Sequence, residues 1–213
     1  MENVKKWHTD KIIDRAVKSL KARQFDVLSF EKREDLVRAI LQQVMPGMTV
    51  GVGGSVGLRE LGLPDLLKGK GVLLLDTWQE GLTSQEVLDL RLRHLTCDLF
   101  LSGINALTEK GEIVNMDGIG NRIGAITFGP GKVILVAGVN KIVPDIESAL
   151  QRIKRVAAPM NARRMGLPLP CAETGYCHDC QSDMRICRVL SIMERRPSTT
   201  DITVYLVAEE LGY

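Results

Sequence analysis

The chain has 213 residues, of which 25% are charged and 45% hydrophobic, and its formal net charge at pH 7 is +2. A chain of this length can bury a full hydrophobic core, and the composition is that of an ordinary globular protein. The nearly balanced charge and an aromatic content of only 4% argue against binding to nucleic acid or to a membrane surface.

The N-terminal segment is charged and lacks the apolar centre of a secretory signal. No apolar run approaches the roughly 20 residues that a membrane-spanning helix needs. The longest runs, such as 72–75 and 133–137, have the length of buried strands. We therefore expect a cytoplasmic protein without a membrane span. In that compartment, clustered cysteines indicate metal or redox chemistry rather than structural disulfides.

Apolar residues recur at helical spacing between Val4 and Leu20, and short apolar runs then alternate with amphipathic stretches. The predicted strands are 26–30, 49–52, 72–76, 98–102, 132–137 and 201–208. The predicted helices that follow the first are 31–43, a short helix after Ser55, 84–95 and 145–156. This alternation predicts an α/β fold with a mostly parallel sheet covered by helices on both faces. We expect one domain over residues 1–213, with a cysteine-bearing insertion at about 168–190 before the last strand.

A glycine-rich turn, G-V-G-G-S at 51–55, follows a predicted strand and opens a predicted helix. Glycines let the backbone turn tightly and approach a ligand, and Ser55 is a good helix N-cap. The spacing matches neither a P-loop nor the dinucleotide fingerprint. An ordinary strand-to-helix turn that binds nothing would have the same composition.

Polar residues gather where the predicted strands end, and ligands of open α/β sheets bind beyond the carboxyl ends of the strands. Asp117 could act there as a general base, and Arg122 or Lys141 could hold an anionic group. Asn121 could cap a helix over 123–127. Each residue taken alone is also explained by turn chemistry. The expected anion-binding residues are Gly53, Gly54, Ser55, Asn105, Gly118, Asn121, Arg122 and Lys141.

Four of the five cysteines, Cys171, Cys177, Cys180 and Cys187, lie close together near the C-terminus. The C-x-x-C pair is a typical metal clamp, and two further thiolates complete a set of four ligands. Such a set suits a [4Fe–4S] cluster or, alternatively, a zinc ion. Two disulfides or four unligated thiols are the remaining interpretations, and a cytosolic location makes them less favoured.

Three stretches resemble the LUD (lactate utilisation) domain: G-V-G-G-S-V-G-L-R-E-L-G at 51–62, the run 98–123 containing N-M-D-G-I-G-N-R, and F-G-P-G-K-V-I-L-V-A-G-V-N-K-I-V at 128–143. The resemblance covers about residues 10–213. The cysteine segment is similar to that of a subgroup that carries the same four cysteines.

The resemblance implies a fold like that of the ribose-phosphate isomerase, glucosamine-phosphate deaminase and CoA-transferase superfamily. It also implies a crevice in which the glycine turn faces the 117–122 loop. Family members are associated with L-lactate oxidation to pyruvate alongside iron–sulfur proteins. The resemblance does not place a CoA-transferase nucleophile, because the nearest carboxylate, Glu60, lies within the predicted short helix.

Three functions agree with these patterns. The first is a subunit or accessory protein of organic-acid oxidation, with an iron–sulfur or oxidoreductase partner, a metal centre and an anionic ligand of phosphate, carboxylate or CoA type. The second is a sugar-phosphate or acyl-CoA enzyme with a structural zinc ion. The third is an assembly module that senses redox state or metal. The sequence leaves open whether the chain forms a homo-oligomer.

Overall fold

The computed structural model describes residues 2–213 and contains two sheets. The larger sheet has six parallel strands in the order β1-β10-β7-β4-β2-β3. Its strands are β1 (Asp26–Phe30), β2 (Thr49–Val52), β3 (Leu73–Asp76), β4 (Leu99–Gly103), β7 (Lys132–Gly138) and β10 (Asp201–Val207). All six were expected from the sequence to within a residue or two. The predicted α/β fold with a mostly parallel sheet is confirmed.

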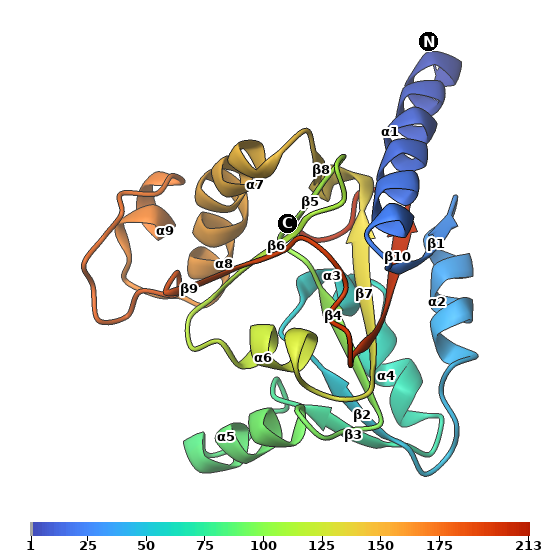
Figure 1. Ribbon diagram of the computed structural model, residues 1–213. Helices are drawn as coiled ribbons and strands as arrows, with labels where there is room; N and C mark the ends of the chain where they lie inside the picture. The colour runs from blue at the N-terminus through green and yellow to red at the C-terminus, as the bar shows by residue number, and fades with distance from the viewer. Residues whose placement is uncertain (1) are drawn as a thin grey trace.

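Helices cover both faces of this sheet, as predicted. One face packs against α1 (Glu2–Ala22), α5 (Ser84–Arg93) and α6 (Asn121–Thr127). The other face packs against α2 (Arg33–Leu41), α3 (Val56–Glu60) and α4 (Leu63–Lys68). Alternate strand residues enter the two cores, since Leu135 belongs to the first and Val136 to the second. The N-terminal end of α1 projects beyond the rest of the chain (Figure 1).

The helices begin where the sequence supplies caps. Thr83 forms a capping box with Glu86 at the start of α5, in which each side chain bonds to the other residue's backbone N–H. Ser55 caps α3 by accepting a hydrogen bond from the backbone N of Leu58 at 3.4 Å. Asn121 is the first residue of α6 and not its cap, because the capping position belongs to Gly120 at φ 78°.

A second sheet of four strands was not predicted from the sequence. Its order is β8-β5-β6-β9, built from β5 (Ala106–Thr108), β6 (Ile113–Asp117), β8 (Ile142–Val143) and β9 (Val189–Met193). The stretch around Asn115 and Asp117 is thus partly strand rather than loop, and β9 pairs antiparallel with it. This pairing places Val189 opposite Asp117 and ties the end of the cysteine segment to the strand ends of the large sheet.

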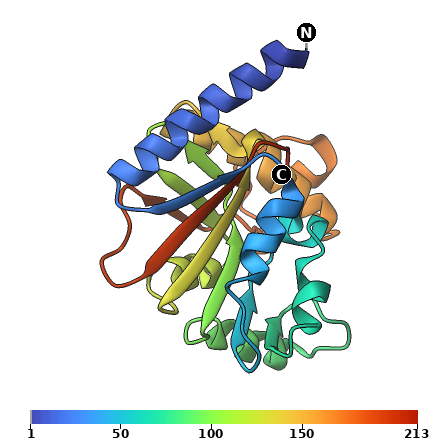
Figure 2. The ribbon, with the colours of Figure 1, turned by 90° about the vertical axis from the view of Figure 1, so that its right-hand side faces the viewer.

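The chain from 139 to 188 forms a helical side of the molecule. The elements are η1 (Val139–Lys141), α7 (Ile146–Arg152), the π-helical turn η2 (Ile153–Ala157), α8 (Ala158–Arg164) and α9 (Pro170–Thr174). In Figure 1, α9 and the loop after it lie beyond α8, at the outer edge of this side. Figure 2 shows the strands of the large sheet side by side. No helix among residues 2–213 is both long and apolar enough to cross a membrane.

Candidate functional site

A crevice of about 300 Å³ lies at the carboxyl ends of β2, β3, β4 and β7. Crevices at this edge of a parallel sheet are the usual ligand sites of such folds. Seven of the eight residues expected to bind an anion line it, together with Asp117: Gly54, Ser55, Asn105, Gly118, Asn121, Arg122 and Lys141. Gly53 does not line it. Its N–H donates to the Leu101 carbonyl at 2.8 Å, and it lies buried against the side chain of Ser102.

The two glycines at the floor of the crevice allow close approach of neighbouring groups. A Cβ added at Gly103 would lie 2.5 Å from Ser55 Oγ and 3.7 Å from Lys141 Nζ. One added at Gly54 would lie 3.3 Å from the indole nitrogen of Trp78. A side chain at residue 103 would therefore occupy the space between the serine hydroxyl and the lysine amine.

Asp117 and Arg122 form the centre of a buried hydrogen-bond network. The guanidinium donates to Asp117 Oδ1 from Nε at 3.0 Å and from Nη2 at 2.8 Å. It also donates to Asn105, to Asn115 and to the backbone oxygens of Gly103 and Met116. Asp117 Oδ2 accepts from the backbone N of Ile123 at 2.8 Å.

This network changes the roles expected for its two charged members. Both oxygens of Asp117 are engaged, so its geometry favours joining β6 to α6 over acting as a general base. The Arg122 guanidinium donates six hydrogen bonds to protein atoms, which leaves it poorly suited to clamp an anion directly.

Lys141 is the most unusual group in the crevice. Its residue is 4% exposed, and among residues 2–213 its amine makes no hydrogen bond or ion pair. Burial, together with the positive charges of Arg152 and Arg122, lowers the pKa of this amine to about 7, and Glu60 opposes the shift. Arg152 is held in place by donating to the backbone oxygens of Asn140 at 3.0 Å and Asn105 at 2.7 Å.

A cationic and aromatic wall closes the outer side of the crevice. Trp78 lies between two guanidinium groups, with Arg59 at 4.7 Å and Arg164 at 4.2 Å from the ring centroid. Arg164 also donates to the Tyr213 hydroxyl at 3.0 Å. Burial alone would raise the pKa of Asp76, but hydrogen bonds from Arg59 and from the backbone N of Trp78 hold it below its usual value.

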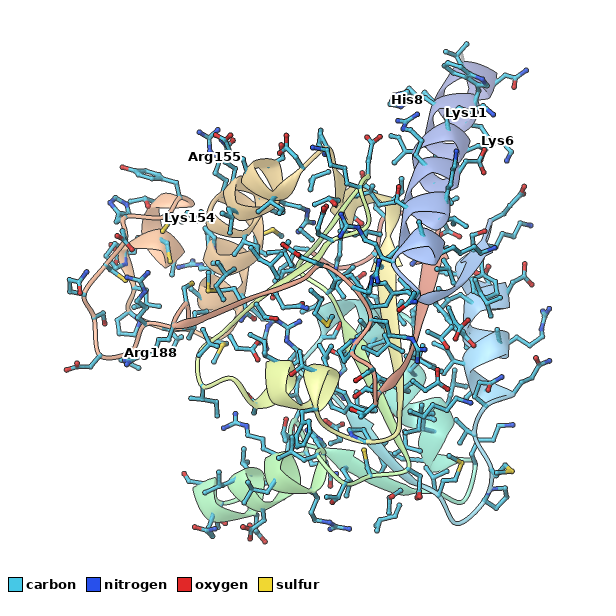
Figure 3. The ribbon with its side chains drawn as sticks, in the orientation of Figure 1. Lys6, His8, Lys11, Lys154, Arg155 and Arg188 are labelled. Atoms are coloured by element: carbon cyan, nitrogen blue, oxygen red, sulfur yellow. The ribbon has the colours of Figure 1, made fainter. Side chains whose placement is uncertain are left out.

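The sequence interpretation missed this wall. Trp78 could have been found, because it comes just after the end of the predicted strand 72–76. Arg164 follows Lys154 and Arg155 along the chain, and the side chains of those two residues are exposed and point outward in Figure 3. Tyr213 comes from the end of the chain, and no local pattern connects it with the crevice.

The four clustered cysteines line one small cavity of about 20 Å³, together with His178 and Arg185. All five cysteines of the chain are free thiols. Arg185 stabilises the loop around the cavity, because it donates to the backbone oxygens of Cys180 and Cys187 at 2.8 Å each. Among residues 2–213, no three His, Cys, Asp or Glu side chains are close enough together to hold a metal ion as they stand.

The thiols nevertheless interact with one another electrostatically. Burial, together with the neighbouring Cys177 and Cys171, raises the pKa of Cys187 to about 11. Burial also raises the pKa of Cys171, with further contributions from Cys180 and Cys177. A bound cation reverses this effect, since it stabilises several thiolates in one place. Four thiols that line one cavity are the donor type that a thiophilic metal prefers.

The cysteine cavity and the crevice share a wall. Ala158, Ile186 and Cys187 border both. Gly118 lies against Ile186 at this wall, where an added Cβ would be 3.5 Å from the Ile186 Cα, an ordinary van der Waals distance. The backbone N of Arg188 donates to the Asp117 carbonyl at 2.9 Å and continues the β6–β9 pairing up to the cavity.

The comparisons with known proteins agree with this fold. The LUD domain model matches residues 13–207. A DUF162 family protein from Deinococcus radiodurans is similar in structure, with a TM-score of 0.53 at 16% identity, covering 93% of this chain and 98% of that one. This likeness shows the fold alone.

Two further solved structures are similar over about half of the chain. The first is eIF2B beta from Chaetomium thermophilum, with a TM-score of 0.38 and 17% identity, and the match covers 55% of this chain and 44% of that one. The second is ribose 5-phosphate isomerase from Plasmodium falciparum, with a TM-score of 0.32 and 19% identity, and the match covers 53% of this chain and 52% of that one. No curated protein matches the chain.

Proposed function

Because the chain belongs to the LUD domain family, which is linked to lactate utilisation, we propose that it takes part in the oxidation of L-lactate or a related organic acid. It binds an anionic small molecule in the crevice and a metal centre at the four cysteines. The observation that carries the proposal is the wall shared by the two cavities, to which Cys187 contributes. A metal centre held there would lie next to the bound ligand.

The lining of the crevice supports an anionic ligand. Arg91 and Arg164 face it from α5 and α8, and Ser55 and Asn121 add uncharged polar groups. Clefts of roughly 300–1,000 Å³ accommodate small metabolites and cofactors, and this crevice lies at the lower end of that range. Because Arg122 is engaged by protein atoms, the ligand's charge is expected to meet Arg91 and Arg164 instead.

The residues that would hold the metal are Cys171, Cys177, Cys180 and Cys187. Four thiolates suit either an iron–sulfur cluster or a zinc ion, and a cluster would supply electron transfer. The cavity as folded, at about 20 Å³, has the size of a single ion. A larger cluster would need the loop to move outward, and the exposed residues between Cys171 and Cys187 leave it free to do so.

The test is anaerobic purification followed by iron, sulfide and zinc analysis and an absorption spectrum. Iron with equimolar sulfide, and a visible band bleached by dithionite, assign a cluster, which places the chain among redox subunits that need an iron–sulfur or oxidoreductase partner. Zinc without colour assigns a structural site.

The Cys177→Ser/Cys180→Ser double variant should lose the metal, and Cys97→Ser should keep it because Cys97 is buried elsewhere in the core. Unchanged metal content in the double variant contradicts the proposal.

The Trp78 wall favours one second candidate, an enzyme acting on an acyl-CoA or a sugar phosphate with zinc at the cysteines. The Arg164 guanidinium lines the crevice beside the Trp78 ring, so it can hold a phosphate while the indole stacks on a flat ring. A rise in melting temperature with acetyl-CoA but not with lactate, and its loss in Trp78→Leu, would support this candidate over the first. A rise in melting temperature with lactate but not with acetyl-CoA would exclude this second candidate.

A further inference from the structure

The amine of Lys141 has the setting of a nucleophile rather than that of a structural cation. Its residue is 4% exposed and lines the crevice, and among the described residues no carboxylate or carbonyl oxygen pairs with its Nζ. Buried lysines normally have a partner, because an unpaired buried charge is costly. An unpaired amine at the wall of a cavity therefore indicates that its partner is a ligand.

The charged groups around Lys141 come from three elements, and they keep the amine neutral over part of the physiological pH range. Arg152 of α7 and Arg122 of α6 repel a proton on it, and both guanidinium groups are fixed by hydrogen bonds. Glu60 of α3 is the opposing charge, and its Oε2 accepts from the backbone N of Gly212 at 2.8 Å. Together with burial, these charges bring the pKa of the amine to about 7.

A desolvated lysine beside other cations is an established kind of activated nucleophile. Since the crevice also presents cationic groups that suit an anion, we propose that Lys141 forms an imine with the carbonyl carbon of a small oxo acid or oxo phosphate. This inference rests on the proposed anion-binding crevice and goes beyond it by naming the reacting atom and the ligand class.

The step balances without an oxidant or a reductant. The neutral Nζ attacks the carbonyl carbon, a C–N bond forms, and one amine proton passes to the former carbonyl oxygen. A second proton, taken up from solvent, lets that oxygen leave as water and gives the protonated imine, which keeps the other amine hydrogen. Ser55 is placed to relay the proton, because its Oγ and the lysine Nζ flank Gly103 on the same side. The anionic group of the ligand is oriented toward Arg164 at the outer wall.

The test is reductive trapping with cyanoborohydride, using pyruvate and dihydroxyacetone phosphate as separate probes. We expect one reduced adduct per chain, located at Lys141 by peptide mass mapping. Its rate of formation should reach half its maximum near pH 7, whereas exposed lysines react appreciably only at higher pH. The two probes distinguish a carboxylate ligand from a phosphate ligand.

Matched variants control for non-specific labelling and for folding. Lys141→Met should remove the adduct and remain folded, since a buried methionine needs no partner. Lys132→Met should keep it, because Lys132 begins β7, the strand that precedes Lys141, and donates to Gln43 at 2.8 Å. Ser55→Ala should slow trapping at least several-fold while leaving the adduct at the same residue.

The outcomes separate this inference from the proposed function. Labelling spread over surface lysines and unchanged in Lys141→Met overturns the imine. A rise in melting temperature with either probe but no adduct also overturns the imine, while the anion-binding crevice stands. Neither an adduct nor a thermal shift contradicts both.

Discussion

The crevice and the cysteine cavity are neighbours with opposite electrostatic needs. Lys141 and Arg122 line the crevice, Arg152 lies near Lys141, and the pKa of the lysine amine falls to about 7. In the cysteine cavity, burial and neighbouring thiols raise the pKa of Cys187 to about 11. Groups of like charge disfavour their own ionised forms until a counter-charge arrives. The crevice, on one side of the shared wall, therefore suits an anion, and the cysteine cavity, on the other side, suits a metal cation.

The two regions also differ in what supports them. The crevice is built on the ends of strands whose side chains fill the two main cores, and Arg122 and Asp117 are held there by hydrogen bonds. The cysteine segment rests on a small cluster of Ala162, Leu169 and Cys171. We therefore expect changes in the crevice to alter global stability and changes in the cysteine segment to alter local order and metal binding.

Removing the central guanidinium should have the largest effect on stability. In Arg122→Met, Asp117 stays buried without its cation, and Asn105 and Asn115 lose a donor. Breaking a buried pair in this way costs about 3–5 kcal/mol. Urea unfolding measures the loss. Arg38→Met, which removes an exposed pair with Asp35, is the control and should change little. Equal losses in the two variants would contradict the network's structural role.

Replacing the buried amine should stabilise the protein. The pKa of Lys141 is lowered from 10.5 to about 7 in the folded chain. Between these values the unfolded chain binds one proton more, so stability rises with pH by at most roughly 1.4 kcal/mol per unit. Below pH 7 the cost of burying the charge is fully present. Lys141→Met should therefore gain up to roughly 4 kcal/mol at pH 7, where nearly all of this cost is present, and lose this pH dependence. A parallel pH profile in the wild-type chain and the variant would exclude the shift.

Changing one cysteine should affect metal content far more than stability. Cys187→Ser should lower bound metal severalfold, because it removes one of four ligands. The global free energy of unfolding in the metal-free protein should change by less than about 1 kcal/mol, since the segment rests on a small cluster. Metal analysis and urea unfolding give the two readings. Limited proteolysis should cut both metal-free proteins between 175 and 188. A large global destabilisation would show that the segment is part of the main core.

The smallest expected effect is at the outer wall. Arg164→Gln removes a guanidinium that lies 4.2 Å from the Trp78 ring centroid, and the contact contributes about 0.5–1 kcal/mol. Binding of an anionic ligand, followed by calorimetry, should weaken severalfold. Arg155→Gln is the matched control, because Arg155 is exposed and does not line the crevice. Equal affinities in the two variants would remove Arg164 from the ligand site.

The large sheet could be predicted because each of its strands leaves a local signal. Buried parallel strands are continuous apolar runs, and 132–137 and 201–208 have this pattern. The second sheet could not be predicted in this way. Its β6 contains the buried polar residues Asn115 and Asp117, which are stable there because Arg122 satisfies them from a different element. From the sequence alone, a polar residue in such a short segment indicates a turn, because the arginine that satisfies it belongs to a different element.

The clustering of the cysteines, the glycine turn and the polar strand ends can be found from the sequence, because each lies within a short stretch of chain. Which of these residues are free to bind a ligand depends on the tertiary structure. Asp117 and Arg122 bind each other, Lys141 has no partner among residues 2–213, and Trp78 and Tyr213 join the crevice. Pairing of β9 with β6 then set the cysteine cavity against the crevice. These outcomes depend on burial and on contacts between distant segments, and local sequence patterns contain neither.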